Sequence, residues 1–315
     1  MSKLFKHVTP TTQDLEIVEL NRQFYMELNR SLIELSFEEL DANDLIKLGD
    51  YIRYVFYYVI GLNSGITVNR TYRMVRNKSI IGDEQSLTKK RHLSYPPEHI
   101  VQKIGRLNRA NSSNFTVFYG SETIDTALNE LKPSTGELVS VGYWEGPPHE
   151  LKAHVVFNHH ADLKFNDISK GARTAYSELV LNNPDFVSAF LANYFELVCR
   201  EFSKEVKNEN EYVISSILAE DILNLEKNPK KKGADLLVYP SVGNRFITSN
   251  LAIKPEVFRR DFNLVKVLEF EVGKTYYDQI RSKETQNLNH ENISIVEPRN
   301  LRVTGQFHEN DILWN

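Results

Sequence analysis

Cysteine is almost missing from this sequence, since Cys199 is the only one among 315 residues. A single thiol excludes an intramolecular disulfide and a cysteine-rich zinc site, and it suits a reducing compartment. The first 20 residues also lack the apolar run of a secretory signal. The most apolar stretch, 54–62, is far shorter than the ~20 residues of a membrane-spanning helix. We therefore expect a soluble, cytoplasmic protein that makes no membrane contact.

An excess of charge of one sign is lacking as well. The formal net charge is -4, and 41% of the residues are hydrophobic and 25% charged, as in an ordinary globular protein. No general basic field favours nucleic acid as a partner. The short lysine run in "NPKKKG", residues 228–233, is typical of a solvated loop.

Helical spacing is present near the N-terminus. Apolar residues recur every three or four positions, first at Ile17, Leu20, Phe24, Leu28, Leu32 and Leu35, and then at Leu45, Leu48, Ile52, Val55 and Val59. This pattern predicts a helical hairpin within residues 1–65, ended by the glycines of "GLNSG". Its apolar stripes need a partner, which is either the following domain or a second chain in a homodimer.

Strands and helices are interspersed from residue 66 onward. Predicted strands cover 66–76, 115–120, 137–144, 151–159, 236–242 and 264–272, and predicted helices cover 121–131, 184–206 and 215–227. The stretch "LSYPPEHI", 93–100, is interpreted as a loop because of its two prolines. The order predicts a mixed α/β (α+β) domain over 66–275. A polar C-terminal extension, 276–315, follows and is expected to pack on that domain, with an edge strand at 299–305.

One stretch, "GRLNRANSSNFTVFYGSETIDTALNEL" at 105–131, carries several candidate site residues. Arg106 offers a planar guanidinium suited to phosphate or carboxylate, Tyr119 an aromatic face, and Glu130 a carboxylate. The turn between strand and helix places Ser121 or Thr123 at a helix N-cap, where backbone N–H groups face outward. Taken singly, these are also ordinary surface residues.

Four separated stretches make the chain resemble the RES-domain family. They are "PP" at 96–97, "GRLN" at 105–108, "VFYGSETIDTALNELKP" at 117–133 and "GADLLVYPSVGNRFITSNLAI" at 233–253, in the order of that family. The matching positions are Arg106, Tyr119, Glu130 and Ser241, with Asn108 and Asn250 as accessory matches and Arg73 similar to the arginine of the family's first strand. The chain departs from the pattern at Leu236, where the family has glycine, and it lacks a Pro-Gly after Asn108.

The resemblance implies an activity. RES proteins are similar in fold to ADP-ribosyltransferases, and many are intracellular bacterial toxins that cleave the nicotinamide–ribose bond of NAD. Phosphate or water is the acceptor, and a helix-turn-helix antitoxin often plugs the pocket and provides any contact with nucleic acid. The resemblance implies catalytic roles for Glu130, Arg106 and Tyr119, and substrate-binding roles for Arg73, Asn108, Ser121, Ser241 and Asn250. NAD is then the substrate, inorganic phosphate is a further partner where it rather than water is the acceptor, and no metal is expected.

Two other functions fit the same residues. One is an ADP-ribosyltransferase that modifies a protein target, and the other is a non-catalytic nucleotide-binding or interaction module. A metal site at His159, His160 and Asp162 is disfavoured, because adjacent side chains of a strand point to opposite faces. Cys199 lies in a helical pattern next to Phe195 and Phe202, which predicts a buried, inert thiol.

Overall fold

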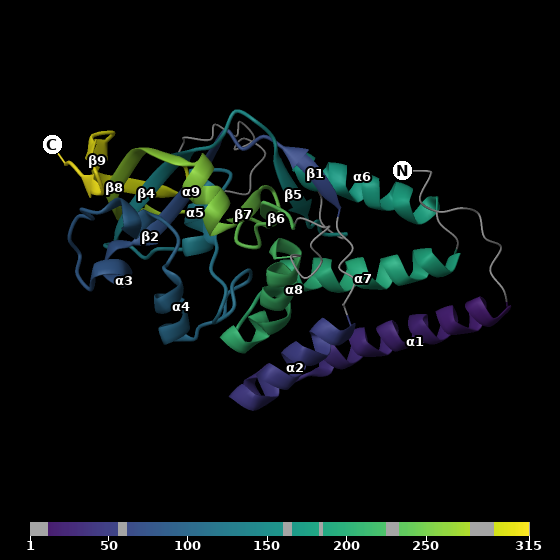
Figure 1. The fold of residues 1–315 in the computed structure, drawn as a ribbon. Helices are drawn as coiled ribbons and strands as arrows, with labels where there is room; N and C mark the ends of the chain where they lie inside the picture. The colour runs from purple at the N-terminus through teal and green to yellow at the C-terminus, as the bar shows by residue number, and fades with distance from the viewer. Residues whose placement is uncertain are drawn as a thin grey trace.

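A nine-stranded sheet organises the protein (Figure 1). The computed structural model describes residues 12–55, 62–159, 166–182, 185–224, 233–277 and 293–314. The strands of the sheet are β1 Asn63–Ile66, β2 Arg70–Arg76, β3 Phe118–Ser121, β4 Leu138–Glu145, β5 Leu151–Val155, β6 Leu236–Pro240, β7 Ser249–Ile253, β8 Asn263–Thr275 and β9 Val296–Thr304. Their order is β1-β5-β6-β7-β3-β2-β4-β8-β9. Only β5 and β6 pair in parallel, and the other neighbours are antiparallel.

Helices of very different length surround this sheet. They are α1 Thr12–Glu34, α2 Ala42–Val55, α3 Asn77–Ile81, α4 Glu98–Ile104, α5 Ile124–Leu131, α6 Asp167–Leu181, α7 Asp185–Ser203, α8 Val213–Leu223 and α9 Pro255–Asp261. Short 3-10 turns occur at η1 Phe37–Glu39, η2 Lys90–Leu93 and η3 Glu209–Tyr212, and a small hairpin joins β10 Phe307–His308 to β11 Asp311–Ile312. The predicted mixed α/β class is confirmed at this level.

The N-terminal helices form an outer layer of the same chain. Helix α1 packs along α7 and α2 along α8, while α7 and α8 contact β6 (Figure 1). Leu28, Leu32 and Ile52 belong to the buried cluster that also contains the strand residues of β6. Leu28, Leu32 and Ile52 of the two stripes are therefore covered by this chain itself, whereas Phe24 is 42% exposed.

Helix α5 packs on a second buried cluster, against β2 and β3. Its N-cap is Thr123, whose side chain accepts a hydrogen bond from Thr126 N at 3.0 Å. Ile124 and Leu128 are fully buried, as expected for one apolar face of a short helix. This anchoring fixes the last turn of α5, which carries Glu130.

Several local predictions are confirmed and others are wrong. Helices α5, α7 and α8 and strands β2 to β6, β8 and β9 lie where the patterns placed them, and β9 is an edge strand. The interpretation of 93–100 as loop fails at its end, because α4 begins at Glu98, directly after Pro97. Helices α6 and α9 were not predicted at all.

Candidate functional site

A cavity of about 460 Å³ brings the candidate residues together. Its walls come from β2, α4, the arginine loop (residues 105–111), β3, α5, η3, β6 and β7. Seven of the eight candidates line it: Arg73, Arg106, Asn108, Tyr119, Ser121, Glu130 and Asn250. The eighth, Ser241, is fully buried and reaches the site by a hydrogen bond to Glu130.

One oxygen of the Glu130 carboxylate is held by three donors. Ser241 Oγ, Asn250 Nδ2 at 2.9 Å and Gly243 N at 3.2 Å all donate to Oε1. Within the described ranges no hydrogen bond or ion pair involves Oε2, and the Glu130 side chain is exposed to solvent at the cavity. The carboxylate is therefore fixed through one oxygen and presents the other to a ligand.

Ser121 orients the amide that holds Glu130. Its Oγ donates to Asn250 Oδ1 at 2.9 Å, so that Asn250 Nδ2 points to the carboxylate. The antiparallel register pairs Ser121 with Asn250 across β3 and β7. The carboxylate of Glu130 can only accept a hydrogen bond, so the amide of Asn250 turns Nδ2 towards Glu130 and Oδ1 towards Ser121. Ser121, Asn250 and Ser241 thus act here through Glu130.

The loop between β6 and β7, residues 241–248, packs its backbone at Gly243 directly against the backbone of α5. A Cβ at Gly243 would lie 2.5 Å from Asn129 O, so only glycine fits. Arg245 and Phe246 have φ of 59° and 69°, a conformation that costs ~1–3 kcal/mol for such residues. Phe246 N donates to Ser241 O at 2.8 Å and closes the loop. This strained turn sets Ser241 and Gly243 against Glu130.

Tyr119 uses its hydroxyl group to hold the arginine loop. The hydroxyl oxygen accepts from Ala110 N at 2.8 Å and donates to Asn111 Oδ1 at 2.8 Å. Burial raises the pKa of Tyr119 well above its ordinary value. The phenol is therefore neutral, and it positions the loop while its ring lines the cavity.

The three arginines of the cavity differ in how they are paired. Arg73 has a buried Nε without a hydrogen-bond partner, and no carboxylate contacts it in the part of the chain that the structure describes. Burial lowers the pKa of Arg73 to about 10, so the guanidinium is still charged at neutral pH. Arg106, 67% exposed, pairs through Nε with Glu209 Oε2 at 2.9 Å. An anion is the ligand that Arg73 lacks.

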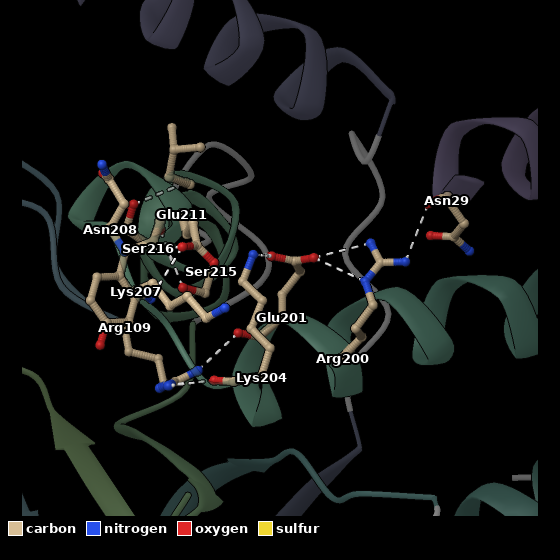
Figure 2. Close-up of polar contacts among 12 residues, drawn as sticks. Asn29, Arg109, Arg200, Glu201, Lys204, Lys207, Asn208, Glu211, Ser215 and Ser216 are labelled. Carbon is tan, nitrogen blue, oxygen red and sulfur yellow. Dashed lines mark hydrogen bonds and ion pairs between the residues drawn. The ribbon is translucent and has the colours of Figure 1, made fainter. Parts of the chain in front are cut away.

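Arg109 is the third of these arginines, and its guanidinium group binds backbone. Nη1 and Nη2 donate to Glu201 O and Lys204 O, both at 3.0 Å, at the C-terminal end of α7 (Figure 2). A cation suits this end of a helix, where carbonyl groups lack partners. Arg109 therefore holds the arginine loop to the C-terminal end of α7.

Sequence reasoning missed several residues of the cavity. Arg109 and Asn111 lie in the quoted stretch, and their spacing from Arg106 was a usable signal. Tyr212 lines the cavity from η3, and no pattern in the sequence pointed to it.

The other reactive groups lie outside the cavity. Cys199 is buried, as predicted, and burial raises the pKa of its thiol to about 12. Among the described residues, no group of three or more His, Cys, Asp or Glu is arranged to hold a metal ion. His160 and Asp162 lie outside the described residues.

Comparisons with protein-family models, curated proteins and solved structures find no match to this chain. In the described part of the chain, no helix has both the length and the apolar character needed to cross a bilayer. The fold and the site alone therefore define the protein at this stage. It is a mixed α/β protein whose cavity combines a fixed carboxylate, Glu130, with a half-buried arginine, Arg73, that has no anionic partner among the described residues.

Proposed function

We propose that this protein is an NAD-consuming enzyme that cleaves the nicotinamide–ribose bond. The observation that carries the proposal is the Glu130 carboxylate, fixed through Oε1 and open at Oε2 in a cavity that also contains Arg73. The resemblance to the RES-domain family, and through it to the ADP-ribosyltransferase fold, supplies the substrate. The same resemblance supports a cytoplasmic bacterial toxin that is neutralised by a helix-turn-helix antitoxin.

Glu130 has the chemistry that this reaction needs. As the bond between ribose C1′ and the nicotinamide nitrogen breaks, its electron pair goes to the pyridinium, which leaves as a neutral ring. Positive charge then develops on the ribose, as in glycoside hydrolysis. A carboxylate held in advance stabilises that charge without reorganising during the reaction. An oxygen of phosphate or water then forms the new bond to C1′, and water releases a proton in doing so.

The arginines complete the proposed mechanism. Arg73 and Arg106 bind the pyrophosphate, with Arg106 exchanging its contact with Glu209 for a phosphate oxygen. Tyr119 places its ring along the ribose or nicotinamide and excludes water. Asn108, exposed at the cavity rim, is positioned for a polar contact with the ligand.

The test is the loss of NAD in the presence of the purified protein, with and without inorganic phosphate. We expect NAD consumption by the wild type and a decrease of at least ~100-fold in kcat for Glu130→Gln, which keeps the shape but removes the charge. Glu178→Gln is the matched control, because Glu178 is exposed on α6, which contributes no residue to the cavity. Equal rates for wild type and Glu130→Gln would refute the mechanism.

The products identify the acceptor. ADP-ribose 1″-phosphate indicates transfer to phosphate, and ADP-ribose indicates hydrolysis. Label from adenine-labelled NAD that stays on a protein would instead indicate an ADP-ribosyltransferase.

A further inference from the structure

A wall of the cavity comes from η3, which lies outside every stretch that resembles the RES family. Tyr212 at the end of η3 lines the cavity and is half-buried. Glu209 at its start pairs with Arg106 at the rim. A four-residue turn therefore supplies both an aromatic ring and a carboxylate to a site whose other parts are strands and α5.

This turn is held in a fixed position. Asn208 and Glu211 form a capping box, with Asn210 N donating to Asn208 Oδ1 at 2.8 Å and Asn208 N to Glu211 Oε1 at 3.0 Å. The Asn210 side chain donates to Phe37 O at 3.1 Å, in the N-terminal helical region. Figure 2 shows Asn208 and Glu211 together with the hydrogen bonds that Arg109 makes to Glu201 and Lys204. Capping and long-range hydrogen bonds thus leave η3 little freedom.

The ring of Tyr212 is fixed as well. The guanidinium group of Arg109 lies over it, 5.3 Å from the ring centroid, and Arg109 is itself anchored on Glu201 O and Lys204 O. A cation above an aromatic ring is attracted to its electron-rich face, which restrains the ring. The orientation of the ring is therefore set before any ligand enters.

Two other tyrosines of the cavity have little ring surface to offer, because Tyr72 and Tyr239 are 1% and 4% exposed. Tyr119 and Tyr212 are the half-buried ones. A dinucleotide carries two planar bases, and aromatic side chains bind bases by stacking.

We propose that Tyr212 is a specificity-determining residue that stacks on a planar heteroaromatic base of the ligand, and that Asn210 positions it. This inference rests on the proposed function. It assigns the recognition of a base to a turn that the N-terminal helical region holds in place. The base is either nicotinamide or adenine, and the ligands of the experiment distinguish the two.

The experiment measures binding by calorimetry for the full chain. Nicotinamide mononucleotide, ADP-ribose and inorganic pyrophosphate are titrated into the wild type and into Tyr212→Leu, which keeps apolar bulk but removes the flat ring. We expect the affinity for at least one of the two base-containing ligands to fall about tenfold, which identifies the base. Tyr212→Phe restores it to within about twofold, and pyrophosphate binding does not change. Asn210→Ala weakens the same ligand by a smaller factor.

Three results would overturn the inference. They are unchanged affinities in Tyr212→Leu, an equal loss for pyrophosphate, and a wild type that binds neither base-containing ligand. A separate NAD-consumption assay keeps the two proposals apart. Base-dependent binding without NAD consumption rejects only the proposed function, and NAD consumption that Tyr212→Leu leaves unaltered rejects only the role of Tyr212.

Discussion

Three donors converge on one oxygen of Glu130, and two of them come from a loop whose backbone touches the end of α5. Hydrogen bonds to a carboxylate contribute ~1.5–3 kcal/mol each, so the loss of this arrangement is costly. Gly243 is the residue that permits it, because any side chain at this position meets the backbone of Asn129.

Gly243→Ala tests this contact. The added Cβ would lie 2.5 Å from Asn129 O, so the loop has to withdraw, and Ser241 and Gly243 N move away from Glu130. We expect kcat for NAD cleavage to fall about tenfold or more, with a loss of ~1–3 kcal/mol in the free energy of unfolding. Gly171→Ala is the control. Its Cβ meets nothing within 4 Å in helix α6, so we expect a gain of ~0.5–1 kcal/mol and unchanged activity.

His154 makes stability depend on pH. It is 2% exposed in β5, and burial together with Lys152 lowers the pKa of its imidazole to about 4. In the unfolded chain the His154 imidazole takes up a proton as the pH falls through 6.5, whereas in the folded protein it does so only near pH 4. The free energy of unfolding is therefore highest above pH 6.5 and decreases as the pH falls towards 4. We expect the loss to reach about 3 kcal/mol.

The measurement is urea unfolding at several pH values between 7 and 4 for the wild type and for His154→Leu. Subtracting the unfolding free energy of His154→Leu from that of the wild type leaves the contribution of His154, because the carboxylates that titrate in the same range are common to both proteins. A difference that stays constant across this range would contradict the prediction.

At the scale of elements, the arginine loop depends on contacts at both of its sides. Tyr119 holds it to β3 through Ala110 and Asn111, and Arg109 holds it to the end of α7. The loop carries Arg106 and Asn108, so its rigidity bears on ligand affinity more than on the chemical step.

Tyr119→Phe removes the two hydrogen bonds while it keeps the ring. We expect faster hydrogen exchange at the Ala110 amide, a loss of ~1–2 kcal/mol in unfolding free energy, and a KM for NAD that rises severalfold with a smaller change in kcat. Tyr54→Phe, at a tyrosine that is 81% exposed on α2, serves as the control. Unaltered exchange at Ala110 would show that the loop does not depend on this hydroxyl.

The sequence predicted the strongly periodic elements and much of the site. Alternating apolar residues identified β4 and β8, and helical spacing identified α7. Helix α6, "DISKGARTAYSELVL", was missed because its glycine and its many polar residues weaken the pattern. Arg106, Tyr119 and Glu130 do line one cavity. The role of Ser121 was not predictable, because it follows from a strand register that pairs residues 129 positions apart.

At the scale of the whole molecule, the N-terminal helices and the sheet share one buried cluster. Ile52 of α2 is fully buried in the same cluster as Trp144 of β4. Arg53 adds an ion pair with Glu220 at 3.1 Å, and Ser112 donates to the same Glu220 oxygen at 3.1 Å. Through Glu220 of α8, helix α2 is thereby connected to the chain segment that precedes β3.

Ile52→Ala tests whether these parts unfold together. A cavity left in a shared core costs ~2–5 kcal/mol, and in a single cooperative transition the urea midpoint followed by tryptophan fluorescence falls accordingly. Ile46→Ala on the same helix, at a side chain that is 62% exposed, should leave the free energy of unfolding within ~0.5 kcal/mol of the wild type. If Ile52→Ala leaves the urea midpoint of the tryptophan fluorescence unchanged, the helical region unfolds separately.

The contacts of Glu130 have a consequence for synthesis on the ribosome. Its donors Ser241, Gly243 and Asn250 follow it by 111, 113 and 120 positions. A nascent chain, or a fragment that stops short of residue 241, therefore lacks the partners of this carboxylate. Any activity that depends on this carboxylate therefore cannot appear before the ribosome has synthesised the segment up to Asn250.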